Sequence, residues 1–135
     1  MSEPLDFDLV YDYSLYVIGI TVPVTMFLGG QVAEFDAKID TGSTYCVFQR
    51  LHAELLGLDV EAGVRIELST PTGSFRAYGH EVSLDVLGIE TVSTVYFGES
   101  EMFDRNILGR IGWLDRVKLG LIDAEAKLFL SQYPR

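Results

Sequence analysis

Within Ala37-Lys38-Ile39-Asp40-Thr41-Gly42-Ser43-Thr44, an alternating apolar run gives way to a carboxylate, a hydroxyl and a glycine. From Ala33 to Ile39 the odd positions are apolar and the even positions polar, which is the period of a half-buried β-strand. Gly42 can adopt a positive φ and turn the chain sharply after that strand. The pattern therefore predicts a strand that delivers Asp40 into a rigid loop, with its side chain held in place.

A second short motif lies far downstream, in Asn106-Ile107-Leu108-Gly109-Arg110, an apolar pair followed by glycine. Together, Asp40-Thr41-Gly42-Ser43 and Ile107-Leu108-Gly109-Arg110 resemble the two signatures of the retropepsin-like aspartic proteases, the single-lobed relatives of pepsin. The resemblance extends from about Tyr16 to Leu130. It implies an all-β fold, a closed acid-protease barrel with a flap hairpin and one or two short helices.

Length and composition limit the other possibilities. A chain of 135 residues is long enough for one core, and we expect one domain over residues 14–135, with residues 1–13 as a flexible arm. Cys46 is the only cysteine, so no intrachain disulfide can form, and we expect a reducing, cytoplasmic setting. A net charge of −10 argues against a nucleic-acid or anionic-membrane partner and favours neutral or basic ligands.

The remaining pattern predicts hairpins around the two motifs. We expect strands over residues 15–24 and 32–39 joined by a Gly29-Gly30 turn, a short strand at Val47-Phe48, and a helix over 49–56 with Leu51 and Leu55 on one face. Further strands are predicted over 64–70, 75–86 and 89–97, followed by a polar loop over 98–105. The chain should end in a short helix over 109–116 that carries Trp113, and a hairpin over 117–122 and 126–130 whose leucines, Leu121 among them, point inward.

Peptide hydrolysis by carboxylates needs two of them, one ionised to take a proton from water and one protonated to polarise the carbonyl. This chain offers one suitable residue, Asp40. A two-fold symmetric homodimer would supply the second, because an isologous interface brings the same loop from each subunit onto the axis. The chemistry thus predicts a homodimeric aspartic endopeptidase that acts on a peptide or protein substrate and needs no cofactor.

The resemblance also implies roles for individual residues. Asp40 would be the catalytic carboxylate, and Thr41 would hydrogen-bond across the dimer axis. Gly42 would permit the turn and face the substrate backbone, and the Ser43 hydroxyl could donate to the outer oxygen of Asp40. Substrate would be bound by residues of the loop, the flap tip and the second motif: Thr44, Thr72, Gly73, Ser74, Phe75 and Ile107. Leu108, Gly109 and Arg110 would pack beneath the catalytic loop as a structural motif.

Three features depart from the retroviral pattern. Thr44 stands where those enzymes have an acid that pairs with the arginine of the second motif, so Arg110 lacks that partner. Ile111 follows Arg110, where Asn or Asp is usual. The chain ends in a hairpin over residues 117–130, closer to the end of a pepsin lobe than to a single interface strand.

Other interpretations are possible at each position. Asp40 could merely cap a turn, His52 is expected on a solvated helix face, His80 in a strand with its hydrogen bonds satisfied, and Cys46 in the core. Two histidines and one cysteine in unrelated elements do not predict a metal site. The alternatives for the whole chain are a catalytically silent peptide-binding or dimerisation module with the same fold, and a monomeric β-barrel that binds a ligand.

Overall fold

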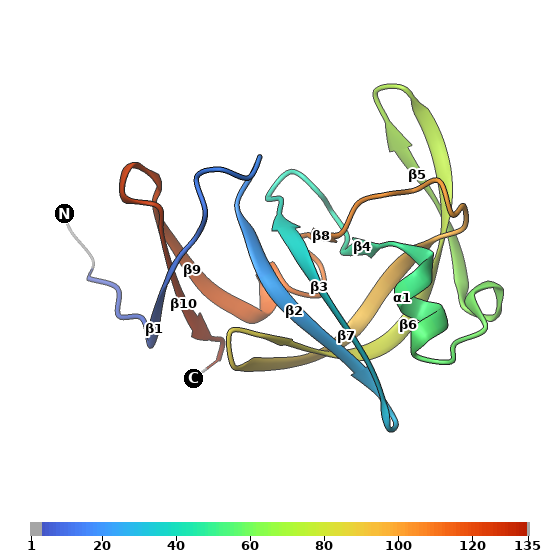
Figure 1. Ribbon diagram of the computed structural model, residues 1–135, viewed down its shortest axis with the longest axis horizontal. Helices are drawn as coiled ribbons and strands as arrows, with labels where there is room; N and C mark the ends of the chain where they lie inside the picture. The colour runs from blue at the N-terminus through green and yellow to red at the C-terminus, as the bar shows by residue number, and fades with distance from the viewer. Residues whose placement is uncertain (1–3, 135) are drawn as a thin grey trace.

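The computed structural model describes residues 4–134, which form two β-sheets and one short α-helix (Figure 1). The elements in chain order are β1 (Leu9–Asp12), β2 (Thr21–Leu28), β3 (Gln31–Ile39), β4 (Val47–Phe48), α1 (Arg50–Leu55), η1 (Val60–Ala62), β5 (Val64–Thr70), β6 (Gly73–Val86), β7 (Ile89–Gly98), β8 (Ile107–Leu108), η2 (Leu114–Arg116), β9 (Val117–Ile122), η3 (Asp123–Glu125) and β10 (Lys127–Gln132).

The larger sheet closes on itself. Its strand order is β2-β3-β8-β4-β7-β6-β5, and β2 also pairs with β6. Val24 of β2 lies opposite Phe35 of β3 on one side and Val86 of β6 on the other. The inward side chains of β2, Val22, Val24 and Met26, are buried, as the period of a half-buried strand requires. The closed, all-β architecture predicted from the sequence is confirmed.

The strand predicted over residues 15–24 begins later than its composition indicated. Residues 15–20 were expected in a strand, but they form turns, and β2 runs over Thr21–Leu28. Gly19 has a φ of +84°, which breaks an extended run. β-Branched and aromatic residues favour strands only where a neighbouring strand and a buried face are available. Tyr16 and Ile18 have no buried face, since both side chains are exposed.

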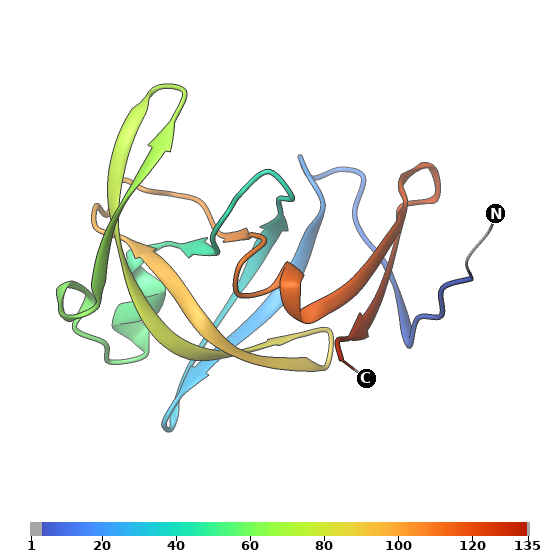
Figure 2. The ribbon, with the colours of Figure 1, turned by 180° about the vertical axis from the view of Figure 1, so that it is seen from behind.

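The hairpin of β5 and β6 stands away from the rest of the molecule (Figures 1 and 2). β6 is 14 residues long, and its second part pairs with β7 from Ala77 opposite Gly98 onward. Its first part pairs with β5 alone, ending with Thr70 opposite Gly73 at the turn. The outer end of the hairpin therefore projects beyond the barrel, at the position that the sequence predicted for a flap.

The chain ends in a three-stranded antiparallel sheet of order β1-β10-β9. The terminal hairpin is as predicted, but Leu121 is exposed rather than inward. Leu9–Asp12 were assigned to a flexible arm, and that prediction is wrong for them, since β1 pairs with β10 with Leu9 opposite Leu130. Residues 1–3 of that predicted arm lie outside the described residues.

The short helix expected over 109–116 is reduced to η2, and Trp113 just before it is fully buried.

The helix α1 is present where predicted but turned to a different face. Leu51 and Leu55 are exposed, whereas His52 and Ala53 are buried. His52 was expected on a solvated face; instead its ring stacks on Phe35 of β3, with 4.0 Å between ring centroids. The spacing of leucines indicated a helix, but packing against β3 decided which side is buried. No helix in residues 4–134 is long and apolar enough to span a bilayer.

Candidate active site

Asp40 follows β3 directly and is fixed by backbone hydrogen bonds. Its N–H donates to the carbonyl of Leu108 at 3.0 Å, which ties it to the neighbouring strand β8. The N–H of Gly42 donates to Asp40 Oδ1 at 2.8 Å, and the N–H of Ser43 donates to the carbonyl of Asp40 at 3.2 Å. Asp40 is half-buried, with one carboxylate oxygen held by the loop that follows it. The rigid loop predicted from the sequence is thus present.

The second motif packs directly under this loop. The N–H of Arg110 donates to the carbonyl of Ser43 at 2.9 Å, and the N–H of Ile111 donates to the carbonyl of Thr44 at 2.8 Å. Gly109 has no room for a side chain, because an added Cβ would lie 2.1 Å from the carbonyl oxygen of Tyr45. Leu108 is fully buried beneath the loop. The two motifs, more than sixty residues apart in the sequence, form one unit.

Ser43 does not hold the position that the resemblance implied. Its hydroxyl donates to the carbonyl of Tyr45 at 2.7 Å and braces the loop from within, rather than bonding to Asp40. The donor to the carboxylate is the backbone N–H of Gly42. Sequence reasoning missed this donor because a main-chain N–H leaves no side-chain signal.

Cys46 lies in the core below the loop, as predicted. Its sulfur accepts a hydrogen bond from the N–H of Gly109 at 3.3 Å, and its side chain is completely buried. Burial raises the pKa of the thiol to about 12, so the sulfur stays protonated at neutral pH. It therefore packs as a small apolar side chain rather than reacting.

A cleft of about 1020 Å³ separates the Asp40 loop from the β5–β6 hairpin. It brings together most of the residues predicted for the site: Asp40, Gly42, Ser43, Thr44, Thr72, Gly73, Ser74, Phe75 and Ile107. Thr41, Leu108, Gly109 and Arg110 do not line it; Thr41 and Arg110 are exposed, and the other two are buried beneath the loop.

The cleft also contains residues that the sequence analysis did not single out: Tyr45, Val47, Leu68, Met102, Phe103 and Arg105. The loop over residues 98–105 was predicted to be a polar loop that leads to the second motif. The adjacent apolar residues Met102 and Phe103 within that acidic segment were the signal that it forms a wall of the site.

An aromatic stack connects the loop over residues 98–105 to the β5–β6 hairpin. The rings of Phe75 and Phe103 lie 4.9 Å apart between centroids and 24° from parallel. Below the stack, the N–H of Glu99 donates to the carbonyl of Arg76 at 2.9 Å. The hairpin is therefore fixed at its lower end to the loop that forms the cleft wall.

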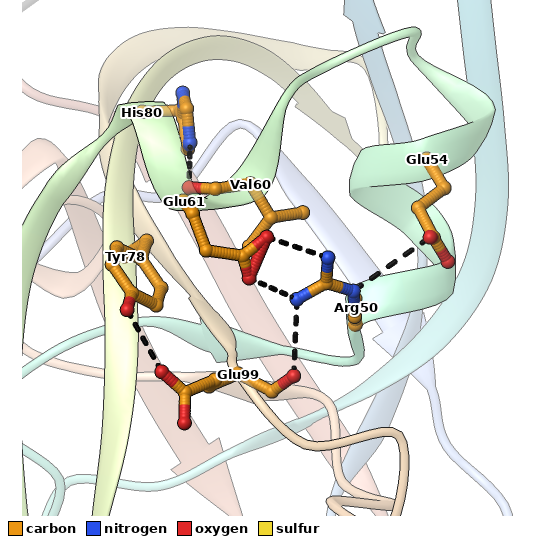
Figure 3. A network of polar contacts seen from close by, with 7 residues as sticks. All are labelled: Arg50, Glu54, Val60, Glu61, Tyr78, His80 and Glu99. Atoms are coloured by element: carbon orange, nitrogen blue, oxygen red, sulfur yellow. Dashed lines mark hydrogen bonds and ion pairs between the residues drawn. The ribbon is translucent and has the colours of Figure 1, made fainter.

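A polar network extends this attachment to α1 (Figure 3). Tyr78 of β6 donates its hydroxyl hydrogen to Glu99 Oε2 at 2.8 Å, and this bond raises the pKa of Tyr78. Arg50 donates to the carbonyl of Glu99 at 3.1 Å and forms a bidentate pair with Glu61, which lowers the pKa of that carboxyl. His80, close by, bonds to the carbonyl of Val60 at 2.9 Å, so it is a satisfied strand residue as predicted.

Two carboxylates line the cleft, Asp40 and Glu67. Glu67 is on the hairpin and forms an ion pair with Arg76 at 3.1 Å. Among residues 4–134, Asp40 belongs to no ion pair, and no group of three or more metal-ligating side chains is present. Residues 4–134 therefore provide the cleft with a single carboxylate that is free of a cationic partner.

The class of fold is confirmed by comparison with solved structures. No family model and no curated protein matches this sequence. The fold is retropepsin-like. One solved structure that it resembles is EIAV protease complexed with the inhibitor HBY-793, with a TM-score of 0.55 and 18% sequence identity. The similarity covers 73% of this chain and 86% of that chain.

Proposed function

We propose that this protein is an aspartic endopeptidase that is active as a homodimer. The observation that supports this most directly is the position of Asp40. Backbone bonds from Gly42 and to Leu108 hold it at the edge of a cleft that faces a projecting hairpin. Because no second carboxylate without an ion pair lines the cleft within residues 4–134, the proposed chemistry requires another copy of the chain.

The two Asp40 carboxylates would divide the work of hydrolysis. Two such groups a few ångströms apart cannot both be ionised cheaply, so the pair holds one proton. The ionised Asp40 takes a proton from a water molecule, whose oxygen attacks the peptide carbonyl carbon, while the protonated Asp40 donates to the carbonyl oxygen. Collapse of the tetrahedral intermediate breaks the C–N bond: the first Asp40 gives its proton to the leaving amine, and the second Asp40 takes back a proton from a hydroxyl of the intermediate, which becomes the carboxylic acid product. Thr41, exposed beside Asp40, would brace the two loops across the axis.

An extended peptide would lie in the cleft between the Asp40 loop and the β5–β6 hairpin. Main-chain hydrogen bonds would give affinity, and alternate side chains would enter the spaces lined by Phe75, Phe103 and Ile107. The hairpin would act as the flap that closes over the substrate and excludes bulk water. We also propose a cytoplasmic location, because the lone buried Cys46 needs no oxidising compartment.

The decisive experiment assays a peptide library against the wild type and Asp40→Asn, with and without a statine-type inhibitor. We expect Asp40→Asn to lower cleavage by at least about 1000-fold, since it removes the group that activates water. Asp36→Asn is the matched control, because Asp36 is an exposed carboxylate on β3, the strand that leads into Asp40, and lies outside the cleft. Cleavage that survives Asp40→Asn would overturn the proposal. Peptide binding without any cleavage by the wild type would instead favour the catalytically silent binding module.

A further inference from the structure

Four consecutive apolar side chains stand exposed on the loop before β2. They are Leu15, Tyr16, Val17 and Ile18, and Ile18 is 90% exposed. Isolated exposed apolar residues are ordinary on a protein surface, but a contiguous group indicates a surface that is covered by something else. We call this group the Leu15–Ile18 loop.

The Leu15–Ile18 loop lies beside the candidate active site. The carbonyl of Ile20, two residues after it, accepts a hydrogen bond from the N–H of Ile39 at 2.9 Å. Gly19 packs on Lys38, since an added Cβ would lie 2.7 Å from Lys38 Cε. Figures 1 and 2 both place the loop that precedes β2 next to the loop that follows β3. The apolar surface therefore borders the residues that deliver Asp40.

Another exposed apolar residue, Ile111, lies close to the Asp40 loop. The N–H of Ile111 bonds to the carbonyl of Thr44, and about half of the Ile111 side chain is exposed. Thr41 and Gly42 are exposed as well. The Leu15–Ile18 loop and Ile111 thus both place exposed, uncharged side chains near the loop that carries Asp40.

Charge restricts what can occupy this surface. The chain carries a net charge of −10, so two copies repel each other unless they meet through an uncharged region. Residues 13–33 contain no Asp, Glu, Lys, Arg or His, the longest such segment of the sequence. A second copy that met the first through Leu15–Ile18 would bury four apolar side chains and no charged side chain of that loop.

We propose that the Leu15–Ile18 loop is the surface on which a second copy of this chain docks, and that this contact brings the two Asp40 residues together. The inference rests on the proposed function, because that function leaves the site incomplete without a partner. Because the loop borders the end of β3 that leads into Asp40, the contact that buries Tyr16 and Ile18 would also set the separation of the two carboxylates.

The test measures dimerisation and cleavage separately. Tyr16→Asp and Ile18→Asp place a carboxylate on each side of the proposed contact, while Leu55→Asp adds the same charge at an exposed apolar residue on α1. Leu121→Asp probes the exposed face of the edge strand β9 as a rival surface. Sedimentation velocity over a dilution series gives the dimer dissociation constant, a peptide substrate gives activity, and circular dichroism confirms folding.

We expect both loop variants to raise the dimer dissociation constant by at least roughly 100-fold and to lose activity in parallel, since juxtaposed like charges cost several kcal/mol. Leu55→Asp and Leu121→Asp should match the wild type. Folded loop variants that remain dimeric, or monomers produced by Leu121→Asp alone, would overturn the inference and leave the proposed function standing. A wild-type dimer that is disrupted by the loop variants but cleaves nothing would uphold the interface and refute the protease.

Discussion

At the level of single residues, backbone groups do most of the work of placing Asp40. Its carboxylate is held by the N–H of Gly42, and its main chain by Leu108. The close approach of Gly109 to Tyr45 lets the second motif support the loop from below. These contacts depend on small residues and main-chain geometry, so a single methyl group in the wrong place should displace the carboxylate.

Gly109→Ala tests this support. The new Cβ would lie 2.1 Å from the Tyr45 carbonyl oxygen, which real Cβ atoms do not tolerate, so the loop must shift. We expect a loss of about 3 kcal/mol in the free energy of unfolding, measured in urea, together with loss of peptide cleavage. Gly30→Ala is the control, because a Cβ there meets nothing within 4 Å and the position has no positive φ. Equal stability of the two variants would refute the steric account.

His52 makes stability depend on pH. Its ring is buried against Phe35, neither ring nitrogen has a hydrogen-bond partner within residues 4–134, and burial lowers its pKa from the usual value of 6.5. The unfolded chain therefore binds the proton more tightly, so stability should fall as the pH drops below about 6.5, by at most about 1.4 kcal/mol per pH unit.

His52→Phe should keep the stack on Phe35 and remove this dependence. Urea unfolding of the wild type and His52→Phe at several pH values between about 7.5 and 5.5 measures this pH dependence. Titration of the carboxylates affects both proteins equally and cancels in their difference. The difference in unfolding free energy between wild type and variant should change with pH over that range. A difference that stays constant would show that His52 does not titrate in this way.

At the level of elements, the β5–β6 hairpin is fixed at its lower end and projects at its tip. Glu99, on the cleft-wall loop, is bonded to both β6 and α1: its carboxylate accepts from Tyr78 and its carbonyl accepts from Arg50 (Figure 3). Its N–H also donates to the carbonyl of Arg76 in β6. The stack of Phe75 on Phe103 is the outermost of these contacts. Motion of the hairpin should therefore be confined to the part beyond Phe75.

Phe103→Ala should release that part of the hairpin. Loss of the stack removes about 1 kcal/mol of aromatic interaction in addition to the buried area. We expect faster amide hydrogen exchange over residues 68–76 and a higher KM for peptide, with the global unfolding transition little changed. Asp104→Ala, at an exposed neighbour on the same loop that does not line the cleft, is the control. Unchanged exchange in Phe103→Ala would mean that the stack does not hold the hairpin.

At the level of the whole molecule, the proposal depends on two chains sharing one site. Adding Asp40→Asn should then lower the cleavage activity of the wild type, because mixed dimers would contain a single catalytic carboxylate. After exchange with a ninefold excess of Asp40→Asn, random pairing leaves about one tenth of the wild-type activity. The same excess of an unrelated protein is the control. Activity that stays constant would show that each wild-type chain works alone.

Much of the larger sheet and of the site could be predicted from local pattern. The alternation from Ala33 to Ile39, the glycine after Asp40 and the apolar pair before Gly109 indicated a strand, a turn and a support, and each is present. The hairpins were predictable for the same reason: a period of two and a turn signal are properties of neighbouring residues. Asp40 and the hairpin residues Thr72–Phe75 accordingly lie around one cleft.

Other features were decided only by tertiary contacts. Residues 15–20 have strand composition but no partner strand, whereas Leu9–Asp12 find one in β10, which lies more than a hundred residues away. The spacing of leucines in α1 indicates a helix but does not decide which of its faces is buried. Contact with Phe35 buries His52 instead of Leu51. Sequence by itself determined the local periods and the role that we propose for Asp40. Segments far apart in the chain decided which faces are buried and which loop borders the site. The reason is that burial and strand pairing require a second segment, so they depend on the partner as well as on the residue itself.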